Sequence, residues 1–579
     1  MTNILDHAIH RHQEGHFGEA NQIYQQILAS DPQNADALHY AGVAAMQMGK
    51  IDIAITYLEQ AIAIRPNIGS FHSNLALAYK DNNQFDKSYE HYQKALALAP
   101  DNPILHFNVG ALFQSSSRLA DASNAYMNSL KYNPNQPLVY HNLGNLLLKQ
   151  GDVAAAIKTS QKAVEMSPDN AEFVSNYLFS LNYSIDHSPE SVLNAHLKWG
   201  QTFANTDLPK PIKTVPDRIR VGYVSPDFRE HAVAKFIQAI LKHHNTERFE
   251  IFCYANVKKA DHMTEKLKQL PIRWRDIYFL DDQSVCHQIQ KDDIHILVDL
   301  AGHSASNRLI VFAMQPAPIQ VTYLGYPNTT GLRQIQYRLV DQHSDPNLNH
   351  FCGSEKRIHL PNGFLCFTPP KNAPRILKKT SPKQITFGSF NNLPKVNMRV
   401  IALWSQILKA LPESRILIKT KGFNDQIIQE KYLIYFQQYG IHRNRIQLMG
   451  EIKGEQGHLD MYNAVDIALD TFPYNGTTTT CEALWMGVPV ITLVGVNHVA
   501  MVGKSILSQT GLKALIARDE NEYIQKAVYL ASHPEERANF THNLRKLMVS
   551  SNLCRADFFV EALESVYTSF VKKGDIGSQ

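Results

Sequence analysis

A period of 34 residues runs through the first third of this chain of 579 residues. Prolines, two columns of small residues and one column of bulky residues recur at this spacing, all in the same phase. The prolines are Pro32, Pro66, Pro100, Pro134 and Pro168. The small residues are Ala20, Ala54, Ser88, Ala122 and Ala156, and also Ala8, Gly42, Ala76, Gly110 and Gly144; the bulky residues are Tyr24, Leu58, Tyr92 and Tyr126, followed by Ser160. Columns in register at one period indicate an array of structural repeats.

Each repeat is expected to fold as a helix, a turn and a second helix. Small residues let the two helices approach, and bulky residues fill the space between neighbouring repeats. Proline ends the second helix because it lacks an N–H group and clashes with the preceding turn. One helix pair cannot bury its apolar face alone, so the repeats stack into an α-solenoid. The pattern resembles the tetratricopeptide repeat, with five repeats over about residues 1–168 and a partial sixth from about Ala171.

A column of asparagines follows the same period. It consists of Asn74, Asn108, Asn142 and Asn176. Each falls on the first helix of its repeat, which usually lines the concave face of such solenoids. A side-chain amide offers both a donor and an acceptor, so a row of them is able to clamp the backbone of an extended peptide. The alternative is that each asparagine only caps or bridges local backbone.

Strands and helical segments begin to alternate after about residue 218. Apolar strand-like runs separated by helical segments are typical of parallel sheets with helices on both faces. The expected strands of a first lobe are 218–225, 249–256 and 294–302, and those of a second lobe are 384–391, 414–420, 445–450, 465–471 and 488–495. Two such lobes facing each other enclose a cleft, and ligands bind at the carboxyl ends of the strands.

These patterns divide the chain into five parts. They are a repeat superhelix over 1–185, a linker helix and connection over 186–217, a first lobe over 218–345, an inter-lobe segment over 346–382 and a second lobe over 383–575. The segment 207–218 is rich in proline and charge and is interpreted as a linker.

Composition excludes several classes of protein. The net charge of +4 is too small for this length to favour nucleic acid or an anionic membrane as a partner. Six cysteines without a C-x-x-C pair indicate a reducing compartment. No signal peptide is recognisable, and the apolar stretch 488–496 is far shorter than the roughly 20 residues of a spanning helix. The chain is therefore predicted to be soluble and cytoplasmic.

The segment 469–492 has the pattern of a phosphate site. A strand ends at Asp470, and a helix is expected to begin in the run Thr477 to Thr480. The free N–H groups and the dipole of a helix start favour an anion. Glu482, a turn further on, is able to accept hydrogen bonds from ribose hydroxyls. The alternative is that the threonines only cap the helix.

A lysine follows the first strand of the second lobe. Asn392 and Lys395 lie in the turn between that strand and the next helix, at the mouth of the expected cleft. A lysine there is able to neutralise a diphosphate as a point charge. The alternative is an ordinary solvated lysine.

Polar residues also follow strands of the first lobe. Asp227 and His231 come after the strand 218–225, and His303 comes after the strand 294–302. A histidine beside a carboxylate is able to relay a proton or orient a hydroxyl. The turn Gly325, Tyr326 and Pro327 brings backbone toward a ligand. The alternatives are structural histidines and a structural turn. No D-x-D triplet and no compact His, Cys and Asp cluster occurs, so no metal is predicted.

The combination of these segments resembles the O-GlcNAc transferase and SPINDLY family of protein O-glycosyltransferases. The resemblance covers about residues 1–570 and is nearest to the SPINDLY branch in GYVSPDF, in TGL after GYPNT, in FGSFNNL and in LDTFPYNGTTTTCE. It implies a GT-B fold of two Rossmann-like lobes. It also implies inversion at the anomeric carbon without a metal ion, which fits the missing D-x-D triplet.

The resemblance implies roles for residues on the nucleotide side. Lys395 would neutralise the diphosphate, with Asn392 beside it. The run Thr477, Thr478 and Thr479 would hold phosphates, and Glu482 would hold the ribose. His458, in the segment GEQGHLDMYNAVD, would lie near the base.

It also implies roles on the sugar and acceptor side. His231 and Asp227 would lie beside the sugar and the acceptor hydroxyl. His196, in NAHLKWG, corresponds to a further active-site histidine. Residues 325–327 would line the sugar pocket, and His303 is counted with them as a sugar-nucleotide residue.

The sequence departs from O-GlcNAc transferases at three nucleotide-side positions. It has Thr477 where they carry a histidine, Glu482 where they carry a ribose-binding aspartate, and Glu455 where they carry a base-contacting lysine. Plant SPINDLY proteins are similar to this chain there and resemble users of GDP-fucose. The donor is thus expected to be UDP-GlcNAc or GDP-fucose.

The expected activity is transfer of a sugar to serine or threonine hydroxyls of proteins held in the repeat groove. The expected partners are acceptor proteins and a nucleotide sugar, without nucleic acid, membrane or cofactor, and a homodimer is left open. Two alternatives are a non-catalytic peptide-binding scaffold and a transferase that acts on a glycan or lipid.

Overall fold

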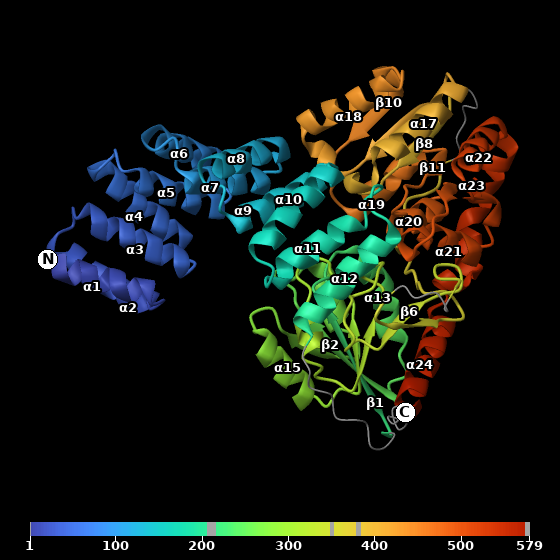
Figure 1. The fold of residues 1–579 in the computed structure, drawn as a ribbon, viewed down its shortest axis with the longest axis horizontal. Helices are drawn as coiled ribbons and strands as arrows, with labels where there is room; N and C mark the ends of the chain where they lie inside the picture. Colours follow the sequence, from blue (N-terminus) through green and yellow to red (C-terminus); the bar gives the residue numbers. More distant parts are fainter. Residues whose placement is uncertain (1, 205–215, 348–352, 378–383, 574–579) are drawn as a thin grey trace. The chain divides into compact units, whose positions relative to one another are not determined.

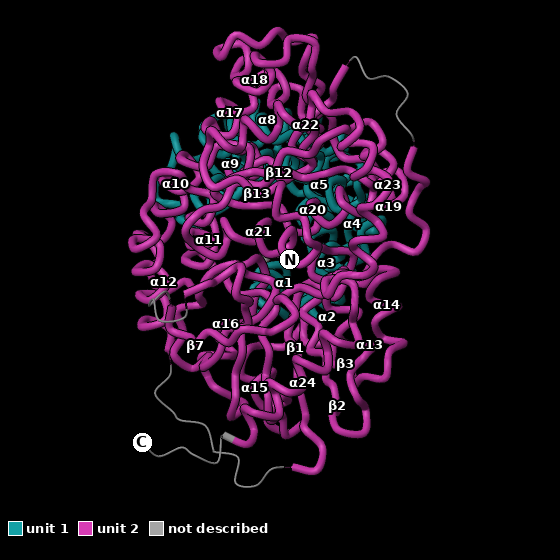
Figure 2. The backbone as a smooth tube through the Cα atoms, turned by 90° about the vertical axis from the view of Figure 1, so that its right-hand side faces the viewer, with its two compact units in different colours: residues 1–147 teal, residues 148–579 magenta. Residues whose placement is uncertain are grey.

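The computed structural model describes residues 2–204, 216–347, 353–377 and 384–573. The chain divides into two compact units, residues 1–147 and 148–579 (Figure 2). Most of the predicted linker 207–218 lies outside the described residues, as do parts of the predicted inter-lobe segment 346–382. The boundary between the units does not coincide with the expected end of the superhelix at residue 185.

The first unit consists of the predicted helix pairs (Figure 1). Its helices are α1 (Thr2–Gln13), α2 (Phe17–Ser30), α3 (Ala35–Gln47), α4 (Ile51–Ile64), α5 (Gly69–Asp81), α6 (Phe85–Leu98), α7 (Pro103–Ser115) and α8 (Leu119–Tyr132), followed by α9 (Pro137–Lys149), in which the division falls. Each second helix ends two residues before its column proline, as at Ser30 and Pro32. The predicted helix, turn and helix repeat is confirmed.

The small and bulky columns face each other inside the repeats. A Cβ atom on Gly42 would lie 2.7 Å from Leu58 Cγ, and one on Gly110 would lie 2.5 Å from Tyr126 Cε1. Tyr126 is 1% exposed and Leu58 is fully buried. The small residues therefore give room to the bulky ones, as the period predicts.

The second unit begins with the end of the repeat array. Its helices α10 (Val153–Met166), α11 (Ala171–Leu181) and α12 (Pro189–Phe203) follow α9. Helices α11 and α12 contact each other, so the expected partial sixth repeat is a complete helix pair. The connection between them is longer than in the other repeats, and this puts α12 out of the 34-residue phase.

These last repeats share a core with the first lobe. Ile157, Leu178 and Trp199 of the repeats belong to one cluster of buried residues with Phe252 and Leu297 of the lobe. This shared core explains why residues 148–203 belong to the second unit.

The first lobe is built on a parallel sheet of order β3-β2-β1-β4-β5-β6-β7. The strands are β1 (Ile219–Ser225), β2 (Phe249–Ala255), β3 (Arg273–Asp276), β4 (Ile296–Asp299), β5 (Ile319–Thr322), β6 (Tyr337–Val340) and β7 (Lys356–His359). The three strands predicted for this lobe are confirmed as β1, β2 and β4. Strand β7 lies inside the predicted inter-lobe segment and adds an edge strand there.

The second lobe repeats this winding with the order β10-β9-β8-β11-β12-β13. The strands are β8 (Thr386–Ser389), β9 (Arg415–Lys419), β10 (Ile446–Met449), β11 (Ile467–Leu469), β12 (Val490–Leu493) and β13 (Ile516–Ala517). In both sheets the chain starts in the middle and reverses direction, between β1 and β4 and between β8 and β11. Ligands of such sheets bind at this switch point.

The last helix of the chain packs on the first lobe. Helix α24 (Ala556–Lys573) contacts α13 (Ala232–His243) (Figure 1). Tyr337 and Phe570 stack with ring centroids 4.0 Å apart, and Tyr567 Oη lies 3.3 Å from Tyr223 Oη. The second lobe is therefore followed by a helix that ties the chain back to the first lobe.

Two glycines bring α12 against the first lobe. A Cβ atom on Gly200 would lie 1.8 Å from the carbonyl oxygen of Gly331, and one on Gly331 would lie 2.0 Å from that of His196. Gly331 also has a φ of +78°, which favours glycine. The helix and the loop thus touch backbone to backbone.

Replacing Gly331 by alanine should separate α12 from the lobe. We expect a loss of about 3 kcal/mol of unfolding free energy from the clash and the positive φ. Chemical denaturation followed by circular dichroism measures it. Gly18→Ala in α2 is the control, because a Cβ atom on Gly18 would meet no atom within 4 Å, and it should be neutral or slightly stabilising. Equal stability of the two variants would contradict the tight contact.

Candidate functional site

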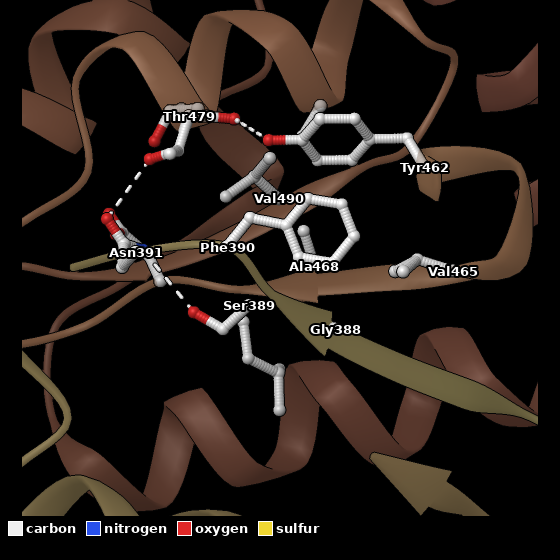
Figure 3. A pocket seen from close by; sticks show the side chains of 13 residues that line it. Gly388, Ser389, Phe390, Asn391, Tyr462, Val465, Ala468, Thr479 and Val490 are labelled. Atoms are coloured by element: carbon white, nitrogen blue, oxygen red, sulfur yellow. Dashed lines mark hydrogen bonds between the residues drawn. The ribbon is translucent and has the colours of Figure 1, made fainter. Parts of the chain in front are cut away.

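A small pocket marks the switch point of the second sheet (Figure 3). It lies between the ends of β8 and β11 and the start of α20 (Thr478–Trp485). Its volume is about 20 Å³, room for roughly one water molecule. The Thr479 hydroxyl donates to Asn391 Oδ1 at 3.0 Å, and the Tyr462 hydroxyl donates to the Thr479 carbonyl at 3.2 Å. These bonds join the strand end to the helix tip.

The predicted helix start in the threonine run is confirmed. Thr477 is the N-cap residue of α20, and its side chain makes no capping bond. The Thr478 hydroxyl is buried and finds no hydrogen-bond partner among the described residues. First-turn amides of a helix lack intrahelical partners. The tip therefore presents unsatisfied donors, which is the arrangement that binds an anion.

Lys395 lies beside this tip. Its Nζ donates to the carbonyl oxygen of Asn475 at 2.7 Å and lies 4.0 Å from the centre of the Tyr474 ring. Burial lowers the pKa of Lys395 to about 8, although the negative charge of Asp470 acts in the opposite direction. The lysine and the helix start predicted from separate segments are thus brought together. Asn392 is exposed.

A chain of charged groups links the two lobes. Glu482 is 3% exposed, and its carboxylate contacts Lys235 of α13 at 2.7 Å and His458 Nε2 at 2.9 Å. The other ring nitrogen of His458, Nδ1, lies 2.5 Å from Lys419 Nζ. Lys235 also contacts Glu455 at 3.3 Å. The predicted ribose and base residues therefore lie together, next to two lysines that the sequence analysis missed.

This network changes the protonation of its members. Burial raises the pKa of Glu482, but the hydrogen bond from His458 and the charge of Lys235 outweigh it and hold that pKa at about 2. For Lys235 the signs are reversed. Burial lowers its pKa, but the contacts with Glu482 and Glu455 outweigh burial and raise the pKa above its ordinary value. Lys235 follows His231, the N-cap residue of α13, by four residues, and this closeness in sequence is a signal from which its place near the site could have been found.

The predicted pair of the first lobe is also close. His231 Nδ1 lies 3.3 Å from Asp227 Oδ2, and the same nitrogen accepts the Val233 N–H at 3.3 Å at the start of α13. Burial raises the pKa of Asp227 and lowers that of His231. The His231 side chain is 38% exposed. A partly exposed neutral imidazole is able to accept a proton.

Three other predicted residues form a buried cluster. His196 Nε2 accepts from the Tyr326 hydroxyl at 2.7 Å, and His196 Nδ1 donates to the Val192 carbonyl at 2.7 Å. His303 Nε2 donates to the Thr330 carbonyl at 2.8 Å and its Nδ1 accepts from Ser175. Both histidines are fully buried, and burial lowers the pKa of each. The cluster therefore supports the turn that contains Gly325 and Pro327 from inside.

Aromatic rings connect this cluster with Lys395. Tyr183 stacks on Tyr474 with centroids 4.8 Å apart, and Phe179 lies 6.4 Å from Tyr326. Sequence reasoning missed Tyr183 and Tyr474, because a single tyrosine outside a periodic column carries no signal of its own.

The asparagine column lies on first helices, as predicted. Asn74, Asn108 and Asn142 are half-buried on α5, α7 and α9, and Asn176 is half-buried on α11 of the second unit. The Asn74 amide donates to His39 Nε2 at 2.7 Å. A peptide-binding role of the column stays a prediction.

The part of the chain that the structure describes contains neither a metal-ligand cluster nor a membrane-spanning helix. No group of three or more His, Cys, Asp or Glu side chains there is placed to hold a metal ion. No helix described there has the length and apolar character needed to span a membrane.

Comparison with known proteins identifies the family. The model of glycosyl transferase family 41 matches residues 202–380 and 373–563. The chain belongs to glycosyl transferase family 41. Tetratricopeptide repeat models of three kinds match residues 11–78, 78–117 and 125–158, the last of which extends into the second unit.

Plant members of the family resemble this chain over its larger part. A protein of Solanum lycopersicum named probable UDP-N-acetylglucosamine–peptide N-acetylglucosaminyltransferase SPINDLY is 39% identical over 432 residues. That match covers 72% of this chain and 46% of the tomato protein. An Arabidopsis thaliana protein with the same enzyme name and the designation SEC is 30% identical, over 60% of this chain and 37% of its own length. The chain thus spans about half the length of the curated relatives it matches.

A solved structure has the same fold. It is a mutant O-GlcNAc transferase of Thermobaculum terrenum, 31% identical, with a TM-score of 0.81 over 87% of this chain and 98% of its own. The repeats followed by two lobes are therefore the arrangement of this family, and the two lobes form a GT-B fold, as predicted.

Glu482→Gln should weaken the link between the lobes. Because the pKa of Glu482 falls from 4.5 to about 2 on folding, its stabilisation is present above pH 4.5 and is lost as the pH falls toward 2. We expect the variant to lose about 3 kcal/mol at pH 7 and much less at pH 3. Urea denaturation at both pH values measures the difference.

Glu430→Gln is the matched control. Glu430 pairs with Arg443 on the surface, where both side chains are about half exposed, and such pairs contribute little. A loss at pH 7 no larger than that of this control would contradict the role of Glu482.

Proposed function

We propose that this chain transfers a sugar from a nucleoside diphosphate sugar to serine or threonine hydroxyls of proteins, with inversion and without a metal ion. The observation that carries the proposal is the contact of Lys395 with the turn that leads into α20. A cation and a helix start with unsatisfied donors lie together at a switch point, which is an arrangement suited to a diphosphate.

The reaction is a single displacement. The acceptor oxygen attacks the anomeric carbon as the bond from that carbon to the diphosphate oxygen breaks, and the hydroxyl proton passes to a base. Negative charge grows on the departing diphosphate, and Lys395 and the donors of the α20 tip stabilise it. Asp227 and His231 stand on the first-lobe side, where the His231 side chain is partly exposed, and this pair is the proposed acceptor of the proton.

Two donors fit this proposal. The names of the plant relatives specify UDP-N-acetylglucosamine. The acidic side chain of Glu455, which is 47% exposed beside Lys235, favours guanine instead. A carboxylate only accepts hydrogen bonds, so it pairs with the two adjacent donors of guanine, N1–H and the 2-amino group, whereas uracil offers the single donor N3–H between two carbonyls. On this ground GDP-linked sugars such as GDP-fucose are the preferred donors.

The acceptor is proposed to be an extended segment of a protein. A solenoid that holds the polypeptide makes the encounter with the donor local and thereby raises the rate. The amides of the asparagine column supply donors and acceptors for a peptide backbone, and they favour a protein over a lipid or a free glycan.

A nucleotide panel should identify the donor. We expect GDP and GDP-fucose to raise the melting temperature more than UDP and UDP-GlcNAc do. A ligand at 100 times its dissociation constant stabilises by about 2.7 kcal/mol, which differential scanning fluorimetry resolves. Larger shifts with the uridine nucleotides would reverse the choice of base, and no shift with any of the four would favour the scaffold alternative.

Lys395→Ala should keep its thermal transition and lose transfer. Among the described residues, one carbonyl and one ring face hold the ammonium, so folding loses little, while loss of an electrostatic stabiliser costs about 100-fold in rate or more. Transfer of radiolabelled sugar to protein measures it. Lys409→Ala, an exposed lysine of α17 (Met398–Ala410), is the control and should transfer normally. Unaltered transfer by Lys395→Ala would refute the assignment.

A further inference from the structure

Each lobe has a buried aspartate after the strand next to the switch point, held by N–H groups of the following turn and by a threonine of the neighbouring strand. In the first lobe, Asp299 at the end of β4 accepts the N–H groups of Ala301 and Gly302 at 3.0 Å and 2.9 Å and the hydroxyl of Thr322 at 2.8 Å. The aspartate is 2% exposed. Each carboxylate oxygen is thus held by the protein.

In the second lobe the corresponding aspartate is Asp470, which follows β11. Its carboxylate accepts the N–H groups of Thr471 and Gly476 at 2.8 Å and 2.6 Å and the hydroxyl of Thr492 at 2.7 Å. It is 1% exposed. The bond to Gly476 spans six residues, so this carboxylate sets the course of the whole turn before α20.

The same turn carries the carbonyl that holds Lys395. The side chain of Asn475 donates to the Thr471 carbonyl at 2.9 Å and accepts the Gly503 N–H at 3.2 Å. Because Asp470 holds the N–H of Gly476, the orientation of the preceding carbonyl, that of Asn475, is fixed. This carbonyl accepts a hydrogen bond from Lys395 Nζ. The turn therefore determines where the ammonium group lies.

The surroundings of Lys395 contain little other charge. The Tyr474 ring lies under it, and Tyr183 stacks on that ring. Within the described ranges no carboxylate lies within the 4.0 Å of an ion pair, and Asp470 is the carboxylate whose charge acts on the lysine. An ammonium that is buried without a counter-charge tends to lose its proton. The charge on Asp470 opposes that loss.

We propose that Asp470 is a positioning residue for the transfer reaction: it shapes the turn that aims Lys395 and supplies the negative charge that keeps this lysine protonated before the nucleotide binds. The inference rests on the proposed function, because it concerns the same diphosphate site. We assign this role to Asp470 and not to Asp299, the corresponding aspartate of the first lobe.

Asp470→Asn tests the charge, because asparagine keeps an acceptor for the two N–H groups. The dissociation constant of GDP, or of whichever nucleotide stabilises the wild type most, is measured by calorimetry from pH 6.5 to 9.5. Wild-type affinity should fall as the pH rises through about 8, where Lys395 loses its proton. In the variant the affinity should begin to fall at a pH about half a unit lower. At pH 9 this corresponds to an affinity about threefold weaker than that of the wild type.

Asp299→Asn is the matched control, since it makes the same change at the corresponding buried aspartate of the first lobe. In this variant the nucleotide affinity should decrease at the same pH as in the wild type. Thr492→Val removes one hydrogen bond to Asp470 but keeps the charge, and it too should not move the fall. A purely structural role of Asp470 predicts weaker binding at every pH without a shift.

The outcomes separate the two proposals. If the wild type binds no nucleoside diphosphate, the proposed function fails before Asp470 is tested. If the wild type binds and Asp470→Asn shows the wild-type pH dependence, the inference is overturned. Asp470→Ser also removes the charge and serves if the asparagine variant does not fold. Failure of both to fold, while Asp299→Asn folds, would overturn the positioning role in favour of a structural one.

Discussion

A partly buried ammonium group is the constraint on which the site depends. Lys395 is partly buried, and among the described residues its close partners are the carbonyl of Asn475 and the face of Tyr474. Burial of a charge with so few partners is costly, and the cost is tolerated only where surrounding structure is rigid. The dense hydrogen bonding of the turn after β11 supplies that rigidity, and the same burial makes the lysine a strong partner for a diphosphate.

The repeated winding of the sheets explains why polar residues distant in sequence meet. Each lobe places its switch point at the carboxyl ends of its first and fourth strands. His231 follows β1, Lys395 follows β8 and α20 follows β11. The ion pair of Lys235 with Glu482 then joins one lobe to the other. The chemistry is thus a property of two copies of one topology and of the few side chains that cross between them.

The repeats and the main strands could be predicted because their signals are long or periodic. Five columns at one period specify helix pairs, and apolar runs such as 219–225 specify buried strands. Strand β3, with the sequence RWRD, and strand β7, with KRIH, could not be predicted, since short edge strands with charged residues lack an apolar pattern.

Site residues that belong to a local sequence motif could be predicted. Site residues that reach the site only through tertiary packing could not. The helix start at Thr477 and the lysine at 395 follow from strand, turn and helix order. Neither the burial of His196 of α12 against Tyr326 nor the contact of Lys235 with Glu482 does, because both arise from segments more than 100 residues apart. The long-range contact, and not the residue type, decides whether such a histidine faces a ligand or the core.

The position of α24 has a consequence for the order of events during synthesis. The face of the first lobe that carries Tyr223 and Tyr337 is covered by residues made more than 200 positions later. When the first lobe has left the ribosome, the apolar face that α24 later covers is still exposed to solvent. The lobe reaches its final packing only after the second lobe and α24 have been synthesised. During this interval the nascent chain is a natural client for a chaperone.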